Sequence, residues 1–186
     1  MNHIHILGAP GSGVTTLGKA LAQRLGFSHF DTDDYYWFTK DALPYRRKRN
    51  PDHRRALLQK DLEKSEAWVL SGALCGWGDV FIPQFEFVIY LWLPPEVRLA
   101  RIREREMQRY GAERLATGGD LNVVFEKFLN WAATYDDAGE NKRNRASELL
   151  WLQKLTCPVS KILEEIPLNV LIEYVLEKLQ TLGPKP

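Results

Sequence analysis

A glycine-rich segment close to the N-terminus restricts the fold of this chain more than any other feature of its sequence. Three glycines at positions 8, 11 and 13 lie between the stretch His3–Leu7 and the amphipathic stretch Val14–Leu25, in which leucines recur at positions 17, 21 and 25. The first stretch predicts a short strand, and the second predicts a helix that stops at Gly26. A strand, a tight glycine turn and a helix, in this order, are typical of the start of an α/β fold.

The rest of the chain continues the alternation of strands and helices. Further strands are predicted at Ser28–Asp31, Trp68–Ser71, Phe85–Leu93 and Pro158–Leu163. Further helices are predicted at Pro51–Ser65, Glu96–Tyr110, Leu121–Tyr135, Ser147–Leu155 and Pro167–Leu182. Phe85–Leu93 is almost continuously apolar, as in a central strand that is buried on both faces. We therefore expect an α/β protein with three layers, α/β/α, built on a five-stranded and mainly parallel sheet.

Composition excludes several classes of protein. The 186 residues suit one domain, and no apolar run approaches the roughly 20 residues that span a bilayer, so no membrane partner is expected. The first residues do not have the pattern of a secretory signal. Cys75 and Cys157 lack the spacing of a metal site or a disulfide framework, which favours the cytoplasm. With 25 basic and 24 acidic residues the formal net charge is +1, so a nucleic-acid partner is not expected, although it is not excluded.

The glycine-rich segment has the composition of a phosphate-binding loop. Glycines allow consecutive N–H groups to point inward as a nest for phosphate oxygens, and the helix that follows adds the positive end of its dipole. Thr15 stands at the position from which a hydroxyl reaches Mg²⁺ in such loops. We therefore predict that the phosphates of ATP bind, with Mg²⁺, at the nine residues Gly8, Ala9, Pro10, Gly11, Ser12, Gly13, Val14, Thr15 and Thr16.

One residue departs from the Walker A pattern G-x-x-x-x-G-K-[ST], because Val14 replaces the lysine. That lysine neutralises charge on the outer two phosphates, so its loss puts catalytic turnover in question. A shifted register would use Gly13, Gly18 and Lys19. It lacks the hydroxyl residue after the lysine, and its first glycine lies at the start of the predicted helix instead of at the end of a strand. We therefore expect Lys19 to face solvent.

Four segments, in their order along the chain, resemble the small P-loop kinases of the adenylate kinase and shikimate kinase type. They are Gly8–Leu21, Phe30–Asp34, Ser71–Gly72 and Tyr90–Arg98. The resemblance extends through most of the chain and implies a P-loop NTPase-like fold in a single domain, residues 1–186. It also implies a mobile helical lid. We place this lid around residues 111–145, where glycines stand at positions 111, 118 and 119.

The same resemblance implies roles for the carboxylates after the second predicted strand. Asp31 would orient Mg²⁺ through water, together with Thr15, and Asp33 or Asp34 would hold the acceptor. Carboxylates at the carboxyl end of a parallel strand lie beside the phosphate loop and can accept a proton from an acceptor hydroxyl, so Asp31 and Asp33 are candidate catalytic residues. Gly72 would allow the acceptor to approach the main chain. Alternatively, Asp31 and Asp34 only end the strand and cap a turn, and Gly72 is only a turn glycine.

Arginines complete the site that the resemblance implies, because in this family they stack on adenine or clamp phosphates. Four are candidate catalytic residues: Arg101, Arg105, Arg143 and Arg145. The first two share one face of the predicted helix with Arg98 and Arg109. A planar guanidinium suits both bidentate phosphate contacts and charge stabilisation. Alternatively, Glu104 and Glu106 pair with these arginines on a solvated face.

These observations predict an ATP-dependent phosphotransferase that acts on a nucleoside monophosphate or on another small molecule. The alternative is a nucleotide-binding regulatory module without efficient catalysis, which acts on a protein or DNA partner. Val14 favours the alternative, and the basic run Arg46–Arg49 is where a polyanionic partner would dock. A structural protein with an empty loop is the third possibility.

Overall fold

The computed structural model describes residues 1–38, 45, 47–137 and 143–183, and its centre is a five-stranded sheet. The strands are β1 (His3–Gly8), β2 (Ser28–Asp31), β3 (Trp68–Ser71), β4 (Phe87–Leu91) and β5 (Val159–Ile162). They lie in the order β2-β3-β1-β4-β5, and every neighbouring pair is parallel. Ile6 of β1 is in register with Ser71 on one side and Ile89 on the other. The predicted parallel α/β sheet is confirmed.

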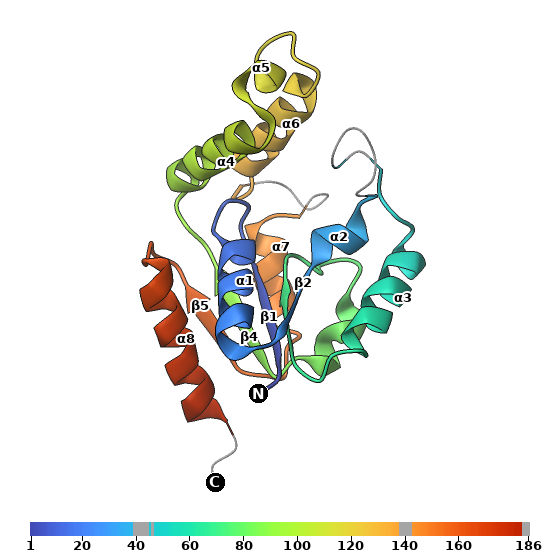
Figure 1. The fold of residues 1–186 in the computed structure, drawn as a ribbon, viewed down its shortest axis with the longest axis vertical. Helices are drawn as coiled ribbons and strands as arrows, with labels where there is room; N and C mark the ends of the chain where they lie inside the picture. Colours follow the sequence, from blue (N-terminus) through green and yellow to red (C-terminus); the bar gives the residue numbers. More distant parts are fainter. Residues whose placement is uncertain (39–44, 46, 138–142, 184–186) are drawn as a thin grey trace.

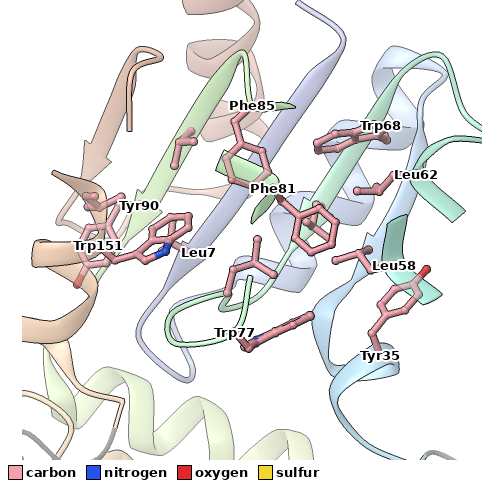
Figure 2. Close-up of a cluster of buried hydrophobic side chains, with 14 residues drawn as sticks. Leu7, Tyr35, Leu58, Leu62, Trp68, Trp77, Phe81, Phe85, Tyr90 and Trp151 are labelled. Carbon is pink, nitrogen blue, oxygen red and sulfur yellow. The ribbon is translucent and has the colours of Figure 1, made fainter. Parts of the chain in front are cut away.

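Helices cover both faces of this sheet (Figure 1). One layer contains α1 (Val14–Leu25) and α8 (Leu168–Leu182); the other contains α3 (Pro51–Leu62), the 3-10 helix η1 (Asp79–Gln84) and α7 (Arg145–Leu152). Under α1 and α8, Leu17, Leu21 and Val175 pack on the apolar side chains of β1 and β4. On the other face, Leu58, Phe81 and Trp151 belong to a larger cluster rich in aromatic side chains (Figure 2). Fully burying one such side chain stabilises the fold by about 1.5–3 kcal/mol, so the three layers are held mainly by these two clusters.

Three further helices form an extension beyond the carboxyl ends of the strands (Figure 1). They are α4 (Pro95–Tyr110), α5 (Ala112–Leu115) and α6 (Asn122–Ala133). Ile102 of α4 packs against Leu129 and Ala132 of α6 in a small apolar cluster of their own. The helical extension therefore includes α4, which precedes the predicted lid at 111–145, as well as helices of that segment. Residues 138–142 of that segment lie outside the described residues, and the mobility of the lid stays a prediction.

Local capping explains where several elements begin and end. Asp31 accepts a hydrogen bond from the N–H of Asp33 and so begins α2 (Thr32–Tyr36), a short helix that the sequence pattern did not predict. Asn144 and Ser147 form a capping box that begins α7 two residues earlier than predicted. Among the helices of the described residues, none has the length and the apolar character needed to cross a bilayer.

Candidate phosphate-binding site

The predicted phosphate loop connects the end of β1 with the start of α1. Gly11 and Gly13 have φ angles of +83° and +97°, which favour glycine, and Gly13 is the N-cap of α1 without any side-chain cap. The N–H groups of Gly13, Val14 and Thr15 make no hydrogen bond within the described part of the chain. Unpartnered N–H groups at the positive end of a helix form an anion site, so the loop has the geometry that phosphate binding requires.

The main chain of two other segments lies in close contact with the loop, at Gly8 and at Gly11. A Cβ on Gly8 would lie 1.9 Å from the carbonyl oxygen of Leu91 at the end of β4. A Cβ on Gly11 would lie 2.5 Å from the carbonyl oxygen of Arg98 in α4. Ser12 is buried and donates its hydroxyl to the carbonyl of Ala9 at 2.7 Å, which closes the turn. These glycines therefore serve packing as well as phosphate access.

Thr15 and Asp31 lie together beside the loop, as the sequence predicted for a magnesium site. The Thr15 hydroxyl donates to Oδ2 of Asp31 at 2.8 Å, while Oδ1 of the same carboxylate caps α2. Mg²⁺ at phosphates usually has one or two protein oxygen ligands and completes its shell with water and phosphate oxygens. Within the described residues no group of three or more His, Cys, Asp or Glu side chains could hold a metal ion. A hydroxyl and a carboxylate oxygen beside the loop are oxygen donors of the kind that Mg²⁺ prefers, and their role as magnesium ligands stays a prediction.

Asp33 and Asp34 lie in the first turn of α2, directly after its N-cap residue Asp31. The surrounding protein limits the hydration of the Asp33 carboxyl, and Asp31 repels its charge. Together these effects raise the pKa of Asp33 to about 6, although part of the side chain remains open to solvent. Reduced hydration and the charge of Asp31 also raise the pKa of Asp34. The three carboxylates therefore form one electrostatically coupled cluster beside the loop.

Gly72 follows β3 and faces this cluster. It has a φ angle of +106°, and a Cβ there would lie 2.0 Å from the Thr32 hydroxyl oxygen and 3.5 Å from Oδ1 of Asp31. The glycine is thus required for packing against the start of α2. Farther along α2, the guanidinium of Arg54 stacks on the ring of Tyr36 at 3.9 Å and donates to the carbonyl of Arg49. An aromatic ring with a cation over it therefore follows the carboxylates on the same short helix.

The predicted arginine face of α4 divides into one buried and several exposed side chains. Arg101 and Arg105 are exposed and form ion pairs, Arg101 with Glu165 and Arg105 with Glu106. Arg101 nevertheless lies close to the loop, because its Nη1 is 3.9 Å from the place of a Cβ on Gly13. The structure therefore brings Arg101 next to the loop but places Arg105 farther along α4.

Arg98, by contrast, is completely buried and acts as a clamp. Its guanidinium pairs with Asp136 and donates to the carbonyls of Leu93 and Ala132. It also approaches the carbonyl of Pro10 in the loop at 3.5 Å. Arg98 therefore joins β4, the loop and the end of α6, a structural role that its place on an arginine-rich face did not reveal.

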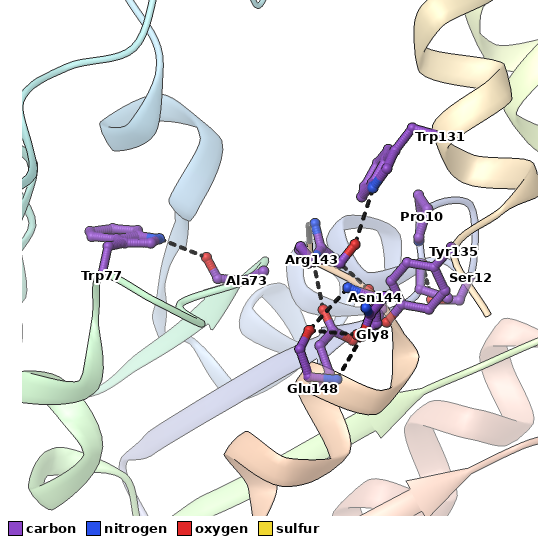
Figure 3. Close-up of polar contacts among 12 residues, drawn as sticks. Gly8, Pro10, Ser12, Ala73, Trp77, Trp131, Tyr135, Arg143, Asn144 and Glu148 are labelled. Atoms are coloured by element: carbon purple, nitrogen blue, oxygen red, sulfur yellow. Dashed lines mark hydrogen bonds and ion pairs between the residues drawn. The ribbon is translucent and has the colours of Figure 1, made fainter. Parts of the chain in front are cut away.

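Arg143 and Arg145 come from the segment that begins α7. Arg143 donates from Nη2 to the carbonyl of Gly8 at 2.7 Å and from Nε to Glu148 at 2.7 Å (Figure 3). The guanidinium of Arg145 stacks on Trp92 at 4.2 Å, and its buried Nε has no hydrogen-bond partner among the described residues. The structure thus brings Arg143 to the first residue of the loop and Arg145 to the end of β4.

Sequence reasoning missed the residues that hold these arginines. Glu148 is fully buried, although it is charged, and it accepts a hydrogen bond from the hydroxyl of Tyr135. Asp136 accepts a hydrogen bond from Trp92 at 2.5 Å in addition to its ion pair with Arg98. The signal for Glu148 was its spacing, because it lies three and four residues before Trp151 and Leu152 on the buried face of α7.

Comparisons with known proteins show which family this chain belongs to. A family model described as AAA domain matches residues 4–122. The Bacillus subtilis (strain 168) protein named "Uncharacterized protein YqaC" is 48% identical over 179 residues, which are 96% of this chain and 98% of that protein. The cytidylate kinase of Archaeoglobus fulgidus is 31% identical over 138 residues, which are 69% of this chain and 74% of that kinase.

Among solved structures, the shikimate kinase from Acinetobacter baumannii in complex with shikimate aligns with a TM-score of 0.59 at 18% identity. The alignment covers 100% of this chain and 96% of that kinase. The resemblance to small P-loop kinases, stated from the sequence segments, is confirmed at the level of fold. The chain belongs to the AAA domain family and has the fold of the small P-loop kinases.

Proposed function

We propose that this protein is an ATP-dependent phosphotransferase that acts on a small molecule. The observation that carries the proposal is the row of unpartnered N–H groups at Gly13, Val14 and Thr15, beside the hydrogen-bonded pair of Thr15 and Asp31. This arrangement offers an anion cradle and a magnesium ligand set at the same edge of the sheet. The proposal agrees with the names of the similar proteins, a cytidylate kinase and a shikimate kinase.

Each part of the site has a role in this proposal. The loop, residues 8–16, binds the phosphates, and Thr15 and Asp31 hold the magnesium ion. Asp33 and Asp34, with Gly72, bind the acceptor, and a carboxylate there accepts the proton of the attacking hydroxyl. The arginines stabilise the charge of the transferred group; they are Arg101, Arg105, Arg143 and Arg145. Bound Mg·ATP supplies the phosphoryl group, and the protein contributes position and electrostatic stabilisation.

The proposal is tested by incubating the protein with Mg·ATP and a panel of nucleoside monophosphates and small hydroxylated metabolites. We expect ADP to form in proportion to one phosphorylated product. Absence of any product and of ATP consumption over the whole panel would contradict catalysis. If ATP nevertheless binds in a calorimetric titration, the result favours the alternative of a regulatory module, for which Val14 is the supporting observation.

The raised pKa of Asp33 predicts a pH dependence of stability that needs no acceptor. In the unfolded chain an aspartate titrates near 3.9, whereas folding raises the pKa of Asp33 to about 6. Between these values the folded state binds more protons, so the contribution of Asp33 to the free energy of unfolding falls as the pH rises through this window. We expect urea titrations to show this fall in the wild-type protein and to show less of it in Asp33→Asn. Identical pH profiles for the two proteins would contradict the raised pKa.

A further inference from the structure

Val14 stands where a Walker A loop has its lysine, so this position has no charge and its side chain contributes to packing instead. The Val14 side chain is partly buried against the apolar cluster beneath α1. The next cation along α1, Lys19, is exposed, and its charge acts on Asp34 and His29. An ATP-binding loop still has to balance the charge of the outer phosphates, so another cation has to lie at its mouth.

Two arginines lie beside the loop: Arg101, which is exposed and pairs with Glu165, and Arg143, which is 129 residues farther along the chain than Val14. Nη2 of Arg143 donates to the carbonyl of Gly8, the first residue of the loop, at 2.7 Å (Figure 3). Its charge also acts on the Asp33 carboxyl, where it opposes the rise in pKa. Arg143 therefore contacts the first residue of the phosphate loop, and its charge reaches a carboxylate of the cluster beside the loop.

The surrounding residues hold this guanidinium in place and keep it charged. Nε donates to Glu148, which is completely buried and also accepts from the hydroxyl of Tyr135. Trp131 donates from its indole to the main-chain carbonyl of Arg143 at 3.1 Å. Although burial acts to lower the pKa of Arg143, the charge of Glu148 raises it overall. A cation fixed in this way loses little conformational entropy when it binds a phosphate.

Part of the guanidinium remains available to a ligand. Nε and Nη2 have partners, whereas Nη1 has none among the described residues. The Arg143 side chain is 32% exposed, while Glu148 beneath it is not exposed at all. The Arg143 side chain is thus partly accessible, although its guanidinium also lies over the ring of Trp131 at 5.6 Å, and Glu148 is shielded from solvent. A guanidinium with one nitrogen still without a partner can donate a charge-assisted hydrogen bond to a phosphate. A buried arginine whose nitrogens all have protein partners cannot do so.

We propose that Arg143, positioned by Glu148 and Tyr135, supplies the positive charge on the outer phosphates that lysine supplies in an ordinary Walker A loop. The inference rests on the proposed function, because it requires that the loop binds ATP. A purely structural clamp between α7 and β1 is the competing explanation, since the bond to Gly8 would also serve that purpose. The two explanations predict different affinities after Arg143 is removed. A phosphate-binding role predicts a loss that grows with the number of phosphates of the nucleotide, whereas a structural role predicts the same loss for every nucleotide.

The test compares ligands that differ only in phosphate number. Calorimetric titrations would use Mg·ATP, Mg·ADP and AMP with the double variant Arg143→Met/Glu148→Gln. This variant removes both charges of the ion pair, and the amide oxygen of the new glutamine can still accept the hydrogen bond from the Tyr135 hydroxyl. We expect ATP affinity to fall roughly tenfold to a hundredfold, ADP affinity to fall less and AMP affinity to stay unchanged. Adding Val14→Lys to this double variant should restore most of the lost ATP affinity.

Two controls make the outcome specific. Arg103→Met removes another arginine of the same region, exposed on α4, and should leave all three affinities unchanged. Thermal melting checks that each variant is folded. Arg143→Lys keeps the positive charge and should therefore retain part of the preference for ATP over ADP and AMP. Equal losses for ATP, ADP and AMP, or no recovery with Val14→Lys, would overturn the role of Arg143. If the wild-type protein itself does not bind ATP, the proposed function is wrong, and the role of Arg143 is wrong with it.

Discussion

Gly11→Ala should abolish ATP binding and destabilise the protein. The new Cβ would lie 2.5 Å from the carbonyl oxygen of Arg98, and the φ angle of +83° is strained for alanine. Strain of about 1 kcal/mol and overpacking of about 1–3 kcal/mol predict a loss of roughly 2–4 kcal/mol in the free energy of unfolding. The displaced loop should lower ATP affinity by more than about a hundredfold, measured by calorimetry at a temperature where the variant is folded.

Gly26→Ala is the matched control for this prediction. Gly26 ends α1 with a similar φ angle of +71°, but a Cβ there would meet no atom within 4 Å. The control therefore carries the backbone strain, about 1 kcal/mol, without the clash. ATP affinity should match that of the wild-type protein. If Gly11→Ala also binds ATP normally, the loop is not the phosphate site.

Asp136→Ala should cause the largest loss of stability outside the loop. The substitution leaves the guanidinium of Arg98 buried without its carboxylate, and it removes the acceptor of the Trp92 indole. Breaking a buried ion pair on one side typically costs about 3–5 kcal/mol, because the remaining charge is neither hydrated nor paired. We expect a loss of this size in urea denaturation. Because Arg98 also reaches Pro10, ATP affinity should fall as well.

Asp120→Ala provides the comparison for a pair of the same chemistry at the surface. Asp120 pairs with Arg114 at 2.7 Å, and both side chains are about half exposed. Solvent screens this pair, so its removal should leave the midpoint of denaturation almost unchanged. Equal stability of Asp136→Ala and Asp120→Ala would show that the buried clamp between the loop and α6 does not hold the fold together.

Local sequence patterns were sufficient to predict most of the fold. The strand–glycine–helix order of the first 25 residues and the continuous apolar run around Phe87–Leu91 predicted the parallel sheet that the structure contains. The short helix α2 was missed because its stability comes from the cap at Asp31 and not from an apolar periodicity. The packing of α4 on α6 was not predicted, because it depends on contacts between distant segments.

The candidate site was predictable where it is local and not where it depends on the tertiary fold. Thr15 and Asp31, at the start of α1 and the end of β2, are joined by a hydrogen bond, and their predicted magnesium role stays a prediction. Arg98, however, has the same sequence signal as the exposed Arg101, and only the fold decides that one is buried and the other is not. Similarly, the sequence does not show that Arg143 reaches Gly8, because this contact depends on how the chain returns from α6 to α7.

The central claim is that main-chain N–H groups at the start of α1 bind the phosphates of ATP although Val14 stands in place of the lysine. A titration of the wild-type protein with ATP, with and without Mg²⁺, in a calorimeter tests it most directly. The account predicts one binding site per chain, a higher affinity with Mg²⁺ and competition by ADP. No detectable heat and no protection from thermal unfolding at millimolar Mg·ATP would contradict it.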